Sequence, residues 1–600
     1  MPRGSGPTTV REVPQIADYA LIGDLCTAAL VSTDGSVDWL CLPRFDSPAC
    51  FSGLLGEDRH GHWRLAPAAG ASQVTRRYLP GTLILQTEFT TGTGSVRVTD
   101  CMPPRSGDPA LVRVAEGLAG TVRMRMTLAP RFEYGLSQPR IQRREGACCM
   151  AGGPEALWLF GPAHMRTQKG IAIAEFEVRQ GEKVPFTLIW RPSRLGAPQP
   201  PLPTLLIRAT QRFWTGWSAG LIVPDRCRGA LIRSLITIKA LTYAPTGGLV
   251  AAPTTSLPAR APGVGTWDYR YCWLRDSALA QDVLLRCGAV GEARRLIDWM
   301  ARAIAGPPAQ LQNLYGPAGE RLLPEVELGW LPGHDGGRPV RIGNAAAAQP
   351  PLAAFGEVQM ARLRARMAGL PDFSASWSGD RLLSVLESAW RQPDCGIWES
   401  RSAPRQFVHS KVMVWAAADA AVKMIERFGD TGPAGRWRLL RSAVRAEVLR
   451  RGYDTGRGTF VLAYDHDRPD ASLLRICQLG MLPAGDDRAR ATVETLEREL
   501  DRGGVLARQA YPDGAAAGDA GYLPASFWLA ECLSLLGRAG DASKLLSYLL
   551  SLCNDVGLLG EAYDQMGRTL AGNFPLAASH LGLVAAVLAV DDAEQGKARR

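Results

Sequence analysis

The sequence lacks the features that mark membrane, secreted and disulfide-stabilised proteins. It contains no apolar run near the roughly 18 residues that span a bilayer, so we expect no membrane partner. The opening stretch has no apolar core of the kind found in secretory signal peptides, and we therefore expect a cytoplasmic protein. The thirteen cysteines are scattered and form no CxxC pair, which argues against a disulfide framework or a structural zinc site.

Lysine is scarce as well. Only seven lysines stand beside 61 arginines, although the formal net charge is +10. The basic residues are interspersed with Asp and Glu and form no run of five or more, so the charge indicates a compositional bias rather than a nucleic-acid partner. HExxH, EF-hand, GxGxxG and P-loop motifs are also missing, and we expect no cofactor and no metal.

What is present indicates a chain in two parts. Six hundred residues suggest two domains or one very large one. Alternating β-branched runs at 82–104, 112–134 and 171–190 are joined by Gly- and Thr-rich turns and predict an antiparallel β-sandwich. The proline-rich stretch 191–204 is typical of a linker, because proline disrupts both helix and sheet hydrogen bonding. We therefore expect an N-terminal β-sandwich domain with its linker at 1–204.

From about residue 205 the apolar spacing becomes that of amphipathic helices. Twelve segments show it, near 205–219, 229–243, 275–287, 290–305, 352–368, 378–391, 410–428, 435–451, 487–500, 523–537, 540–553 and 574–590. Their succession predicts an (α/α)6 barrel of six inner and six outer helices over 205–592, followed by a tail at 593–600. An α-solenoid is the alternative, but the chain shows no fixed repeat. Long loops such as 306–349 would lie at one mouth of the ring, where functional residues tend to gather.

The stretch "GTWDYRYCWLRDSALA" at 265–280 is rich in aromatic and charged residues just before a predicted helix. Its candidate sugar-binding residues are Trp267, Asp268, Tyr269, Arg270, Trp273, Arg275 and Asp276. Aromatic rings can stack on the C–H faces of a sugar while carboxylates and guanidinium groups bond its hydroxyls. The alternative is a helix N-terminus capped by Asp276, with the aromatic rings in the core.

A second stretch, "GIWESR" at 396–401, places Glu399 directly after Trp398. Together with other blocks, these stretches resemble glycoside hydrolase family 15, which includes bacterial glucoamylases and trehalases. The matching blocks are 16–51, 251–280, 329–349, "GIWESR" with "HSKVMVWAAADAA", and "GEAYD" with "LAGNFPLAASHLGLV". The resemblance implies an N-terminal antiparallel β-sandwich followed by an (α/α)6 barrel, in agreement with the periodicity.

The resemblance also implies a mechanism. Family members invert the configuration at the anomeric carbon. One glutamic acid protonates the leaving oxygen and a second glutamate activates water, and the two carboxyl groups stand about 6.5–9.5 Å apart. By motif match the acid falls on Glu399 and the base on Glu561. Trp398 would provide an apolar contact that raises the pKa of the acid.

Other matched positions are expected to bind substrate or support the site. Arg275 and Asp276 would hold hydroxyls of the non-reducing-end glucosyl unit, and Trp273 and Tyr269 would line its pocket. Five further residues have a structural alternative. Arg341 and Asn344 would lie at the pocket rim or, alternatively, fix a loop by hydrogen bonds. His409 and Lys411 follow the acid but could instead cap the helix that begins there, and His580 is more typical of a core histidine than of a catalyst.

Several positions depart from the family pattern, in loops expected to contact sugar. They are Ala259, Pro351, Ala353, Ala510, Leu576 and Ala578. In particular, Ala510 stands where an arginine normally precedes the Tyr-Pro pair. Because a lost hydroxyl-binding side chain leaves its partner unpaired, these departures put the preferred sugar in question while both glutamates remain.

The sequence therefore predicts an inverting, exo-acting glycoside hydrolase. It would release glucose from the non-reducing end of an α-linked oligosaccharide or disaccharide. A glucoamylase-type activity is the first expectation because it is the broader class, and a trehalase of the same family is the alternative. A carbohydrate-binding relative with altered catalysis is one rival, and retention of both glutamates argues against it. A phosphorolytic enzyme is the other, and retention of Glu561 argues against that.

Overall fold

The computed structural model describes residues 14–144, 146–162, 165–259, 265–370, 379–464, 466–510 and 520–596. The chain divides into two compact units. The first comprises residues up to 79, 83–212 and 329–338, and the second comprises 80–82, 213–328 and 339 onward. The expected boundary at 204 falls next to the start of helix α1 (Pro203–Ala219), and the units divide inside that helix. Of the expected tail at 593–600, residues 597–600 lie outside the described residues, and α13 (Ala577–Glu594) includes its first two.

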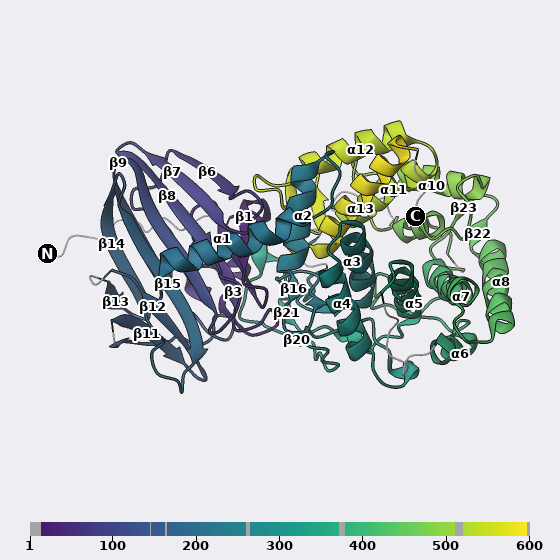
Figure 1. Cartoon of the computed structure of the whole chain (residues 1–600), viewed down its shortest axis with the longest axis horizontal. Helices are drawn as coiled ribbons and strands as arrows, with labels where there is room; N and C mark the ends of the chain where they lie inside the picture. Colours follow the sequence, from purple (N-terminus) through teal and green to yellow (C-terminus); the bar gives the residue numbers. More distant parts are fainter. Residues whose placement is uncertain are drawn as a thin grey trace. The chain divides into compact units, whose positions relative to one another are not determined.

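The first unit is built on an antiparallel sheet of 15 strands (Figure 1). They are β1 (Tyr19–Gly23), β2 (Ala28–Ser32), β3 (Ser36–Cys41), β4 (Ala49–Phe51), β5 (His62–Pro67), β6 (Gln73–Tyr78), β7 (Leu85–Thr91), β8 (Gly94–Cys101), β9 (Ala110–Ala129), β10 (Arg140–Arg144), β11 (Ala147–Gly152), β12 (Glu155–Phe160), β13 (Arg166–Gln168), β14 (Ile171–Arg179) and β15 (Lys183–Pro192).

Strand β9 joins the two halves of this sheet. Its first half pairs with β8 and β15, and its second half pairs with β14 and β5. In the second half Met124 and Met126 are buried while Arg123 and Arg125 are exposed, which is the period-two pattern of a strand with one face on the core.

The second unit is a closed double ring of helices, and the predicted fold class is confirmed. The inner helices are α3 (Leu274–Arg286), α5 (Leu352–Met367), α7 (Val408–Phe428), α9 (Leu474–Gln478), α11 (Leu523–Leu535) and α13. The outer helices are α2 (Arg228–Ala240), α4 (Val290–Ala303), α6 (Gly379–Ala389), α8 (Ala434–Arg451), α10 (Asp487–Leu500) and α12 (Ala539–Ser551). Each inner helix contacts the next inner helix, α13 returns to α3, and an outer helix packs against each (Figure 1).

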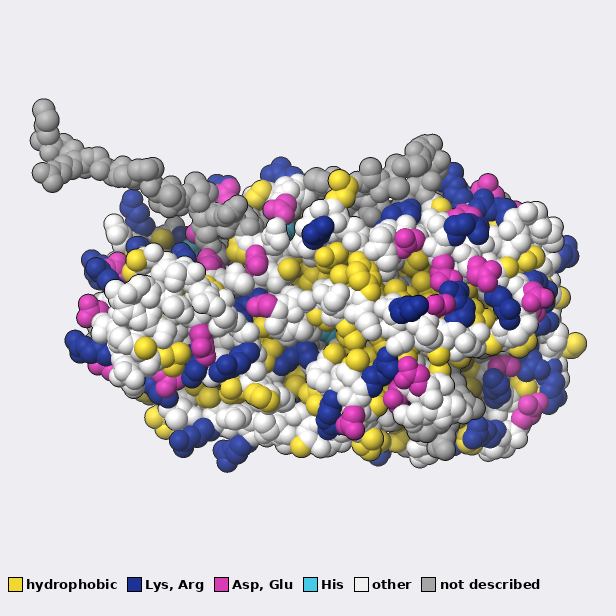
Figure 2. All heavy atoms as spheres, turned by 90° about the horizontal axis from the view of Figure 1, so that it is seen from above, with side chains coloured by type: hydrophobic (Ala, Val, Ile, Leu, Met, Phe, Trp, Pro, Cys, Tyr) yellow, Lys and Arg dark blue, Asp and Glu magenta, His cyan; other side chains and the backbone are white. Residues whose placement is uncertain are grey.

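Burial distinguishes the two rings. The inner helix α11 buries every residue from Leu523 to Ser534, as expected of a helix that is apolar all round. The outer helix α8 instead buries only Trp437, Leu440, Val444 and Val448, which recur at helical spacing along one face. On the face shown in Figure 2, basic side chains are interspersed with acidic ones over the helices, as the sequence predicts.

One member of the ring was missed by the sequence prediction. Helix α9 has five residues, too few for a 3.6-residue period to show, whereas α1 was counted as a ring helix although it precedes the ring. No helix in the described ranges is long and apolar enough to cross a membrane.

The loops differ in length at the two ends of the inner helices. Short links, such as 287–289, 429–433 and 536–538, lead from inner helices to outer ones. Longer loops lead into the first turns of the inner helices and carry short strand pairs. These strands are β16 (Thr242–Tyr243), β17 (Gly248–Leu249), β18 (Cys272–Trp273), β19 (Leu314–Tyr315), β20 (Val326–Glu327), β21 (Arg341–Ile342), β22 (Tyr453–Asp454), β23 (Thr459–Phe460), β24 (Gly521–Tyr522), β25 (Ala562–Asp564) and β26 (Thr569–Ala571).

Candidate active site

The two proposed catalytic glutamates lie in loops that lead into inner helices. Glu399 precedes α7, Glu561 precedes α13, and Trp273 is the residue before α3. The structure links them through shared partners: Arg508 pairs with Glu561, while electrostatic contacts from Arg508 and Arg275 reach Glu399. The sequence blocks therefore meet at the N-terminal ends of the inner helices.

Glu399 sits in a tight turn. Its backbone φ of 49° is left-handed, and its amide donates to the carbonyl of Gly396 at 3.2 Å. A non-glycine residue held in this region costs on the order of 1–3 kcal/mol, and such strain is common at functional sites. The indole Nε1 of Trp273 donates to Glu399 Oε1 at 2.8 Å, which fixes the carboxyl group.

The surroundings of Glu399 favour its protonated form. The residue is partly exposed, but its carboxyl lies deep enough that desolvation raises its pKa, against the opposing effects of the Arg275 charge and the Trp273 hydrogen bond. Arg275 is held by Asp276 Oδ1 at 2.9 Å and by the carbonyl of Ile397 at 3.2 Å. A carboxyl that retains its proton in this way can serve as a general acid.

Trp398 has different partners from those we expected. Its Nε1 donates to Asp470 Oδ2 at 2.9 Å, and its ring stacks on Trp528 at 6.3 Å between centroids and meets the edge of Tyr522 at 5.4 Å. The tryptophan hydrogen-bonded to the acid is Trp273. Because Trp398 precedes a residue in a left-handed turn, the two neighbouring side chains engage separate groups.

We expect Trp273→Phe to move the alkaline limb of the kcat/KM profile to higher pH. The indole hydrogen bond lowers the pKa of Glu399, so its loss should raise that pKa further. An acid is active below its pKa, so the variant should stay active to higher pH. Trp398→Phe, which loses a bond to Asp470 instead, is the control; an equal shift in both variants would contradict the assignment.

Glu561 is 1% exposed and accepts hydrogen bonds on both oxygens. The Tyr269 hydroxyl donates to Oε1 at 2.9 Å, Arg508 forms an ion pair with the same oxygen, and the amide of Asn573 donates to Oε2 at 3.2 Å. Burial and the neighbouring Glu561 charge raise the pKa of Tyr269, which therefore keeps its donor proton. Donors on both oxygens hold this side chain as an acceptor, as a general base requires.

Gly572 has no side chain, and this makes room for the side chain of Glu561. Its φ is 77°, and a Cβ there would lie 2.5 Å from Glu561 Cβ and 2.7 Å from Oε2. We expect Gly572→Ala to destabilise the fold by about 1–2 kcal/mol through the left-handed backbone alone, and to lower kcat further by displacing Glu561.

Gly458→Ala is a matched control for this prediction. Gly458 has a φ of 68°, but the nearest atom to an added Cβ is the Tyr453 hydroxyl at 4.0 Å. Thermal unfolding should show similar losses in both variants, and only Gly572→Ala should lose kcat. Equal kcat values in the two variants would contradict the role given to this contact.

Arg508 is the main functional residue that the sequence interpretation missed. We noted a missing arginine at Ala510, but Arg508, two residues earlier, reaches Glu561 and lies over the Tyr522 ring at 4.2 Å. The one sequence signal that could have identified Arg508 was the presence of an arginine two positions before Ala510, in the same loop.

Part of the stretch 265–280 serves as scaffold. Asp268 and Arg270 form a buried ion pair, with Nε to Oδ1 at 2.9 Å and Nη2 to Oδ2 at 2.6 Å. Asp268 also accepts from the amide of Gly343 at 3.1 Å and, through its carbonyl, from Asn344 Nδ2 at 3.1 Å. Asn344 Oδ1 in turn caps the short helical turn that follows it. These contacts match the loop-fixing alternative for Asn344.

The remaining residue of the stretch, Trp267, lies among charged groups. The guanidinium carbons of Arg341 and Arg401 lie 4.6 and 4.5 Å from its ring centroid. Both arginines pair with Glu325, at 3.7 and 2.9 Å. Arg401 was not singled out in the sequence, although it completes the "GIWESR" motif.

The other candidates have structural partners. Lys411 donates to the carbonyls of Trp390 and Gln392, just beyond the end of α6, at 2.5 and 2.9 Å. It therefore caps α6 and not its own helix. His580 is buried and bonded to the Leu559 amide and the Ser234 hydroxyl at 3.2 and 2.9 Å.

Three of the departures from the family pattern lie beside the proposed catalytic groups or their hydrogen-bond partners. Ala353 lines a small cavity together with Glu399. Leu576 and Ala578 pack in an apolar cluster against Tyr269, the residue that donates to Glu561. These small or apolar side chains therefore shape the packing around both carboxyls.

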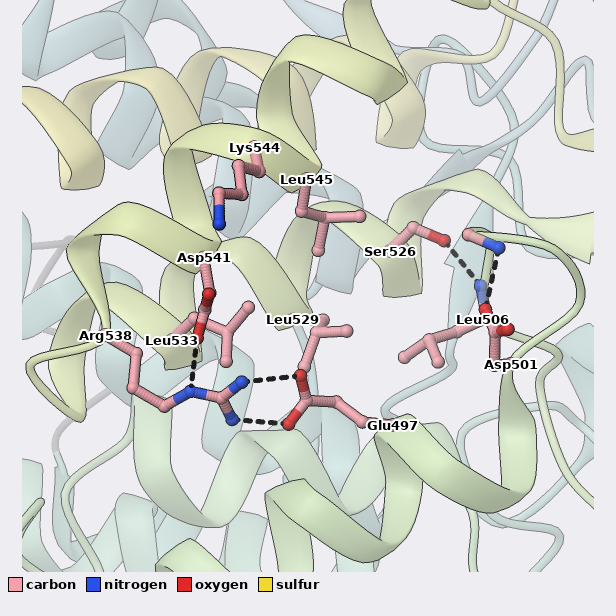
Figure 3. Close-up of a pocket in the computed structure, with 11 residues that line it drawn as sticks. Glu497, Asp501, Leu506, Ser526, Leu529, Leu533, Arg538, Asp541, Lys544 and Leu545 are labelled. Atoms are coloured by element: carbon pink, nitrogen blue, oxygen red, sulfur yellow. Dashed lines mark hydrogen bonds and ion pairs between the residues drawn. The ribbon is translucent and has the colours of Figure 1, made fainter.

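Two further features of the structure concern ligand binding. Among the described side chains, no group of three or more His, Cys, Asp or Glu is arranged to hold a metal ion. A separate hollow lies between α10, α11 and α12, with an apolar floor of Leu529 and Leu533 and a rim where Arg538 pairs with Glu497 and Asp541 (Figure 3). Its lining includes none of the predicted site residues.

Comparison with known families agrees with this geometry. The family model for glycosyl hydrolases family 15 matches residues 226–588, and that for the trehalase-like N-terminal domain matches residues 9–188. The chain belongs to glycoside hydrolase family 15. This family 15 protein is a glycoside hydrolase, as the sequence predicts.

Curated relatives cover nearly the whole chain. A trehalase of Mycolicibacterium smegmatis is 36% identical, covering 99% of this chain and 94% of the relative. Trehalases of Mycobacterium tuberculosis and Thermoplasma volcanium are 34% and 31% identical, covering 97% and 96% of this chain and 90% and 93% of their own length. A bacterial glucoamylase crystallised with acarbose shares the fold, with a TM-score of 0.69 at 12% identity over 99% of this chain and 96% of its own.

Proposed function

We propose that this family 15 hydrolase cleaves α,α-trehalose with inversion, using Glu399 as the acid and Glu561 as the base. The relatives named trehalase align over nearly their full length at 31–36% identity, whereas the likeness to a glucoamylase rests on fold at 12% identity. The alternative raised from the sequence is therefore better supported than the glucoamylase-type activity expected first.

The contrast between the two carboxyls carries the mechanistic part of the proposal. Desolvation raises the pKa of Glu399, and a neutral indole donates to one of its oxygens. Glu561 instead faces a guanidinium, a hydroxyl and an amide, all of them donors. Two carboxyls in such different environments suit the acid and base roles of an inverting glycosidase.

The proposed reaction proceeds in one displacement. Glu561 takes a proton from a water molecule as its oxygen attacks one anomeric carbon of trehalose. Glu399 gives its proton to the glycosidic oxygen as the bond between that carbon and the oxygen breaks. The attacked glucose leaves as the β-anomer, and the other glucose keeps its own C1–O bond and leaves as the α-anomer. The separation of about 6.5–9.5 Å between the two carboxyls remains a prediction.

A substrate panel tests this specificity. We expect kcat/KM on trehalose to exceed that on maltose and isomaltose by at least about 10-fold, a difference of roughly 1.4 kcal/mol in transition-state binding. Faster turnover of maltose would restore the glucoamylase-type interpretation. Saturable binding of these sugars without turnover would favour the carbohydrate-binding rival.

A further inference from the structure

His409, the second residue of α7, lies beside the proposed acid. It is 3% exposed, and neither ring nitrogen has a hydrogen-bond partner in the described part of the chain. Burial, assisted by the charges of Arg475 and Arg275, lowers its pKa to about 3, so the ring is neutral near pH 7. A neutral imidazole presents one donor and one acceptor, and leaving either unpaired in the interior costs about 1–3 kcal/mol.

A small cavity with both polar and apolar lining adjoins this ring. It holds about 30 Å³, and its polar lining comes from Arg275, Asn313, Glu357, Glu399 and His409. Such a volume accommodates at least one water molecule, and the lining supplies more than the two to four polar partners that a buried water needs. The small side chain of Ala353 also lines the cavity, which connects this departure from the family pattern with the space beside the acid.

Glu357 is a second carboxyl on the same cavity. It lies on α5, is 4% exposed, and desolvation raises its pKa against the charges of Arg475, Arg364 and Arg275. The charge of Arg275 acts on both Glu357 and Glu399. The cavity therefore joins two carboxyls, which can take up and release protons, and a neutral imidazole, which can donate and accept a hydrogen bond at the same time.

We propose that His409 and Glu357 are positioning residues that return a proton to Glu399 after each turnover, through water in the cavity they share. This rests on the proposed role of Glu399 as the acid. Inverting hydrolysis leaves Glu399 as a carboxylate and Glu561 protonated, so one proton must reach Glu399 and one must leave Glu561 before the next cycle. A cavity water gives a proton to Glu399 and takes one from protonated Glu357, which then regains a proton from solvent water. Along the other route the neutral ring of His409 relays a proton: its N–H donates to the cavity water while its other nitrogen accepts a proton from a second water. By either route the net proton comes from solvent, to which Glu561 returns the proton that it took from the attacking water.

Two substrates separate this role from a structural one. Trehalose needs a protonated Glu399, whereas α-glucosyl fluoride does not, because fluoride leaves as a stable anion without a proton. We expect His409→Phe to lower kcat on trehalose about 10-fold, less than the 10²–10⁴-fold expected for loss of the acid itself, and to leave kcat on the fluoride within about 2-fold. The solvent deuterium isotope effect on trehalose kcat should rise as proton return becomes limiting.

Glu357→Gln gives a second test if the His409→Phe variant folds poorly. It should likewise lose kcat on trehalose and keep kcat on α-glucosyl fluoride. His580→Gln is the matched control, because His580 is equally buried but its nitrogens are partnered. This variant should change kcat on trehalose and kcat on the fluoride by the same factor. Equal losses on both substrates in the His409 and Glu357 variants, or no loss on either, would overturn the proposal.

Glu399→Gln is assayed in parallel. If it loses trehalose turnover and keeps fluoride turnover, the acid assignment stands and the other variants decide the present inference. If it keeps trehalose turnover, the proposed function itself is wrong.

Discussion

Replacement of Glu561 by glutamine is expected to lower kcat on trehalose by about 10²–10⁴-fold. The amide keeps the shape of the side chain but cannot take a proton from the attacking water. The one oxygen of the amide can still accept from Tyr269 and Arg508, whereas its NH2 group then faces the Asn573 amide, so the fold should persist with one hydrogen bond lost. Because every glucosyl substrate needs an activated water, turnover of α-glucosyl fluoride should fall as far as that of trehalose.

Steady-state kinetics with a thermal unfolding curve measure this effect. Glu292→Gln is a suitable control, since Glu292 is a partly buried carboxylate that pairs with Lys239 at 2.7 Å, on outer helices α4 and α2. That variant should lose some stability and keep its kcat. A Glu561→Gln enzyme with near wild-type turnover would exclude this residue as the base.

Replacement of Glu399 by glutamine is expected to lower kcat on trehalose by a similar factor of about 10²–10⁴ while sparing the fluoride. The alcohol that leaves from trehalose is a poor leaving group without a proton, and glutamine has none to give. Trp273 can still donate to the amide oxygen, so binding of the glucosyl unit should change little. The opposite behaviour of the two glutamate variants toward the fluoride assigns acid and base separately.

An equal loss on both substrates would contradict the assignment of Glu399 as the acid. It would indicate instead that the residue binds the glucosyl unit. Circular dichroism on the same preparations shows whether a loss of activity reflects unfolding, and Glu292→Gln is again the reference for a charge removed elsewhere.

The sequence predicts the architecture well because long elements carry strong periodic signals. The β-sandwich and the ring of helices follow from apolar spacing and motif blocks, whereas the roles of the two glutamates come from motif match and remain a prediction. Helix α9 is missed because five residues show no period, and its place in the ring depends on packing against α7 and α11. The segment 329–338 belongs to the first unit through its tertiary contacts, and its local sequence pattern does not predict this.

Side-chain partners were the least predictable part of the site. The tryptophan next to the acid in sequence, Trp398, bonds Asp470, while Trp273, more than a hundred residues away, bonds the acid. Arg508, two residues before Ala510, reaches Glu561 because arginine has a long side chain, and a match by position alone does not identify it. Asp268 and Arg270 have the composition of a sugar site but pair with each other, and composition alone cannot distinguish the two uses.

The most direct test of the account is NMR of the first products from trehalose in water enriched in ¹⁸O, before mutarotation. Proton spectra identify the anomers, and the ¹⁸O-induced shift of the C1 signal in ¹³C spectra locates the label. The account predicts α- and β-glucose in equal amounts, with ¹⁸O in the β-anomer alone, since water attacks one anomeric carbon with inversion. Release of α-glucose only, or label in the α-anomer, would contradict it.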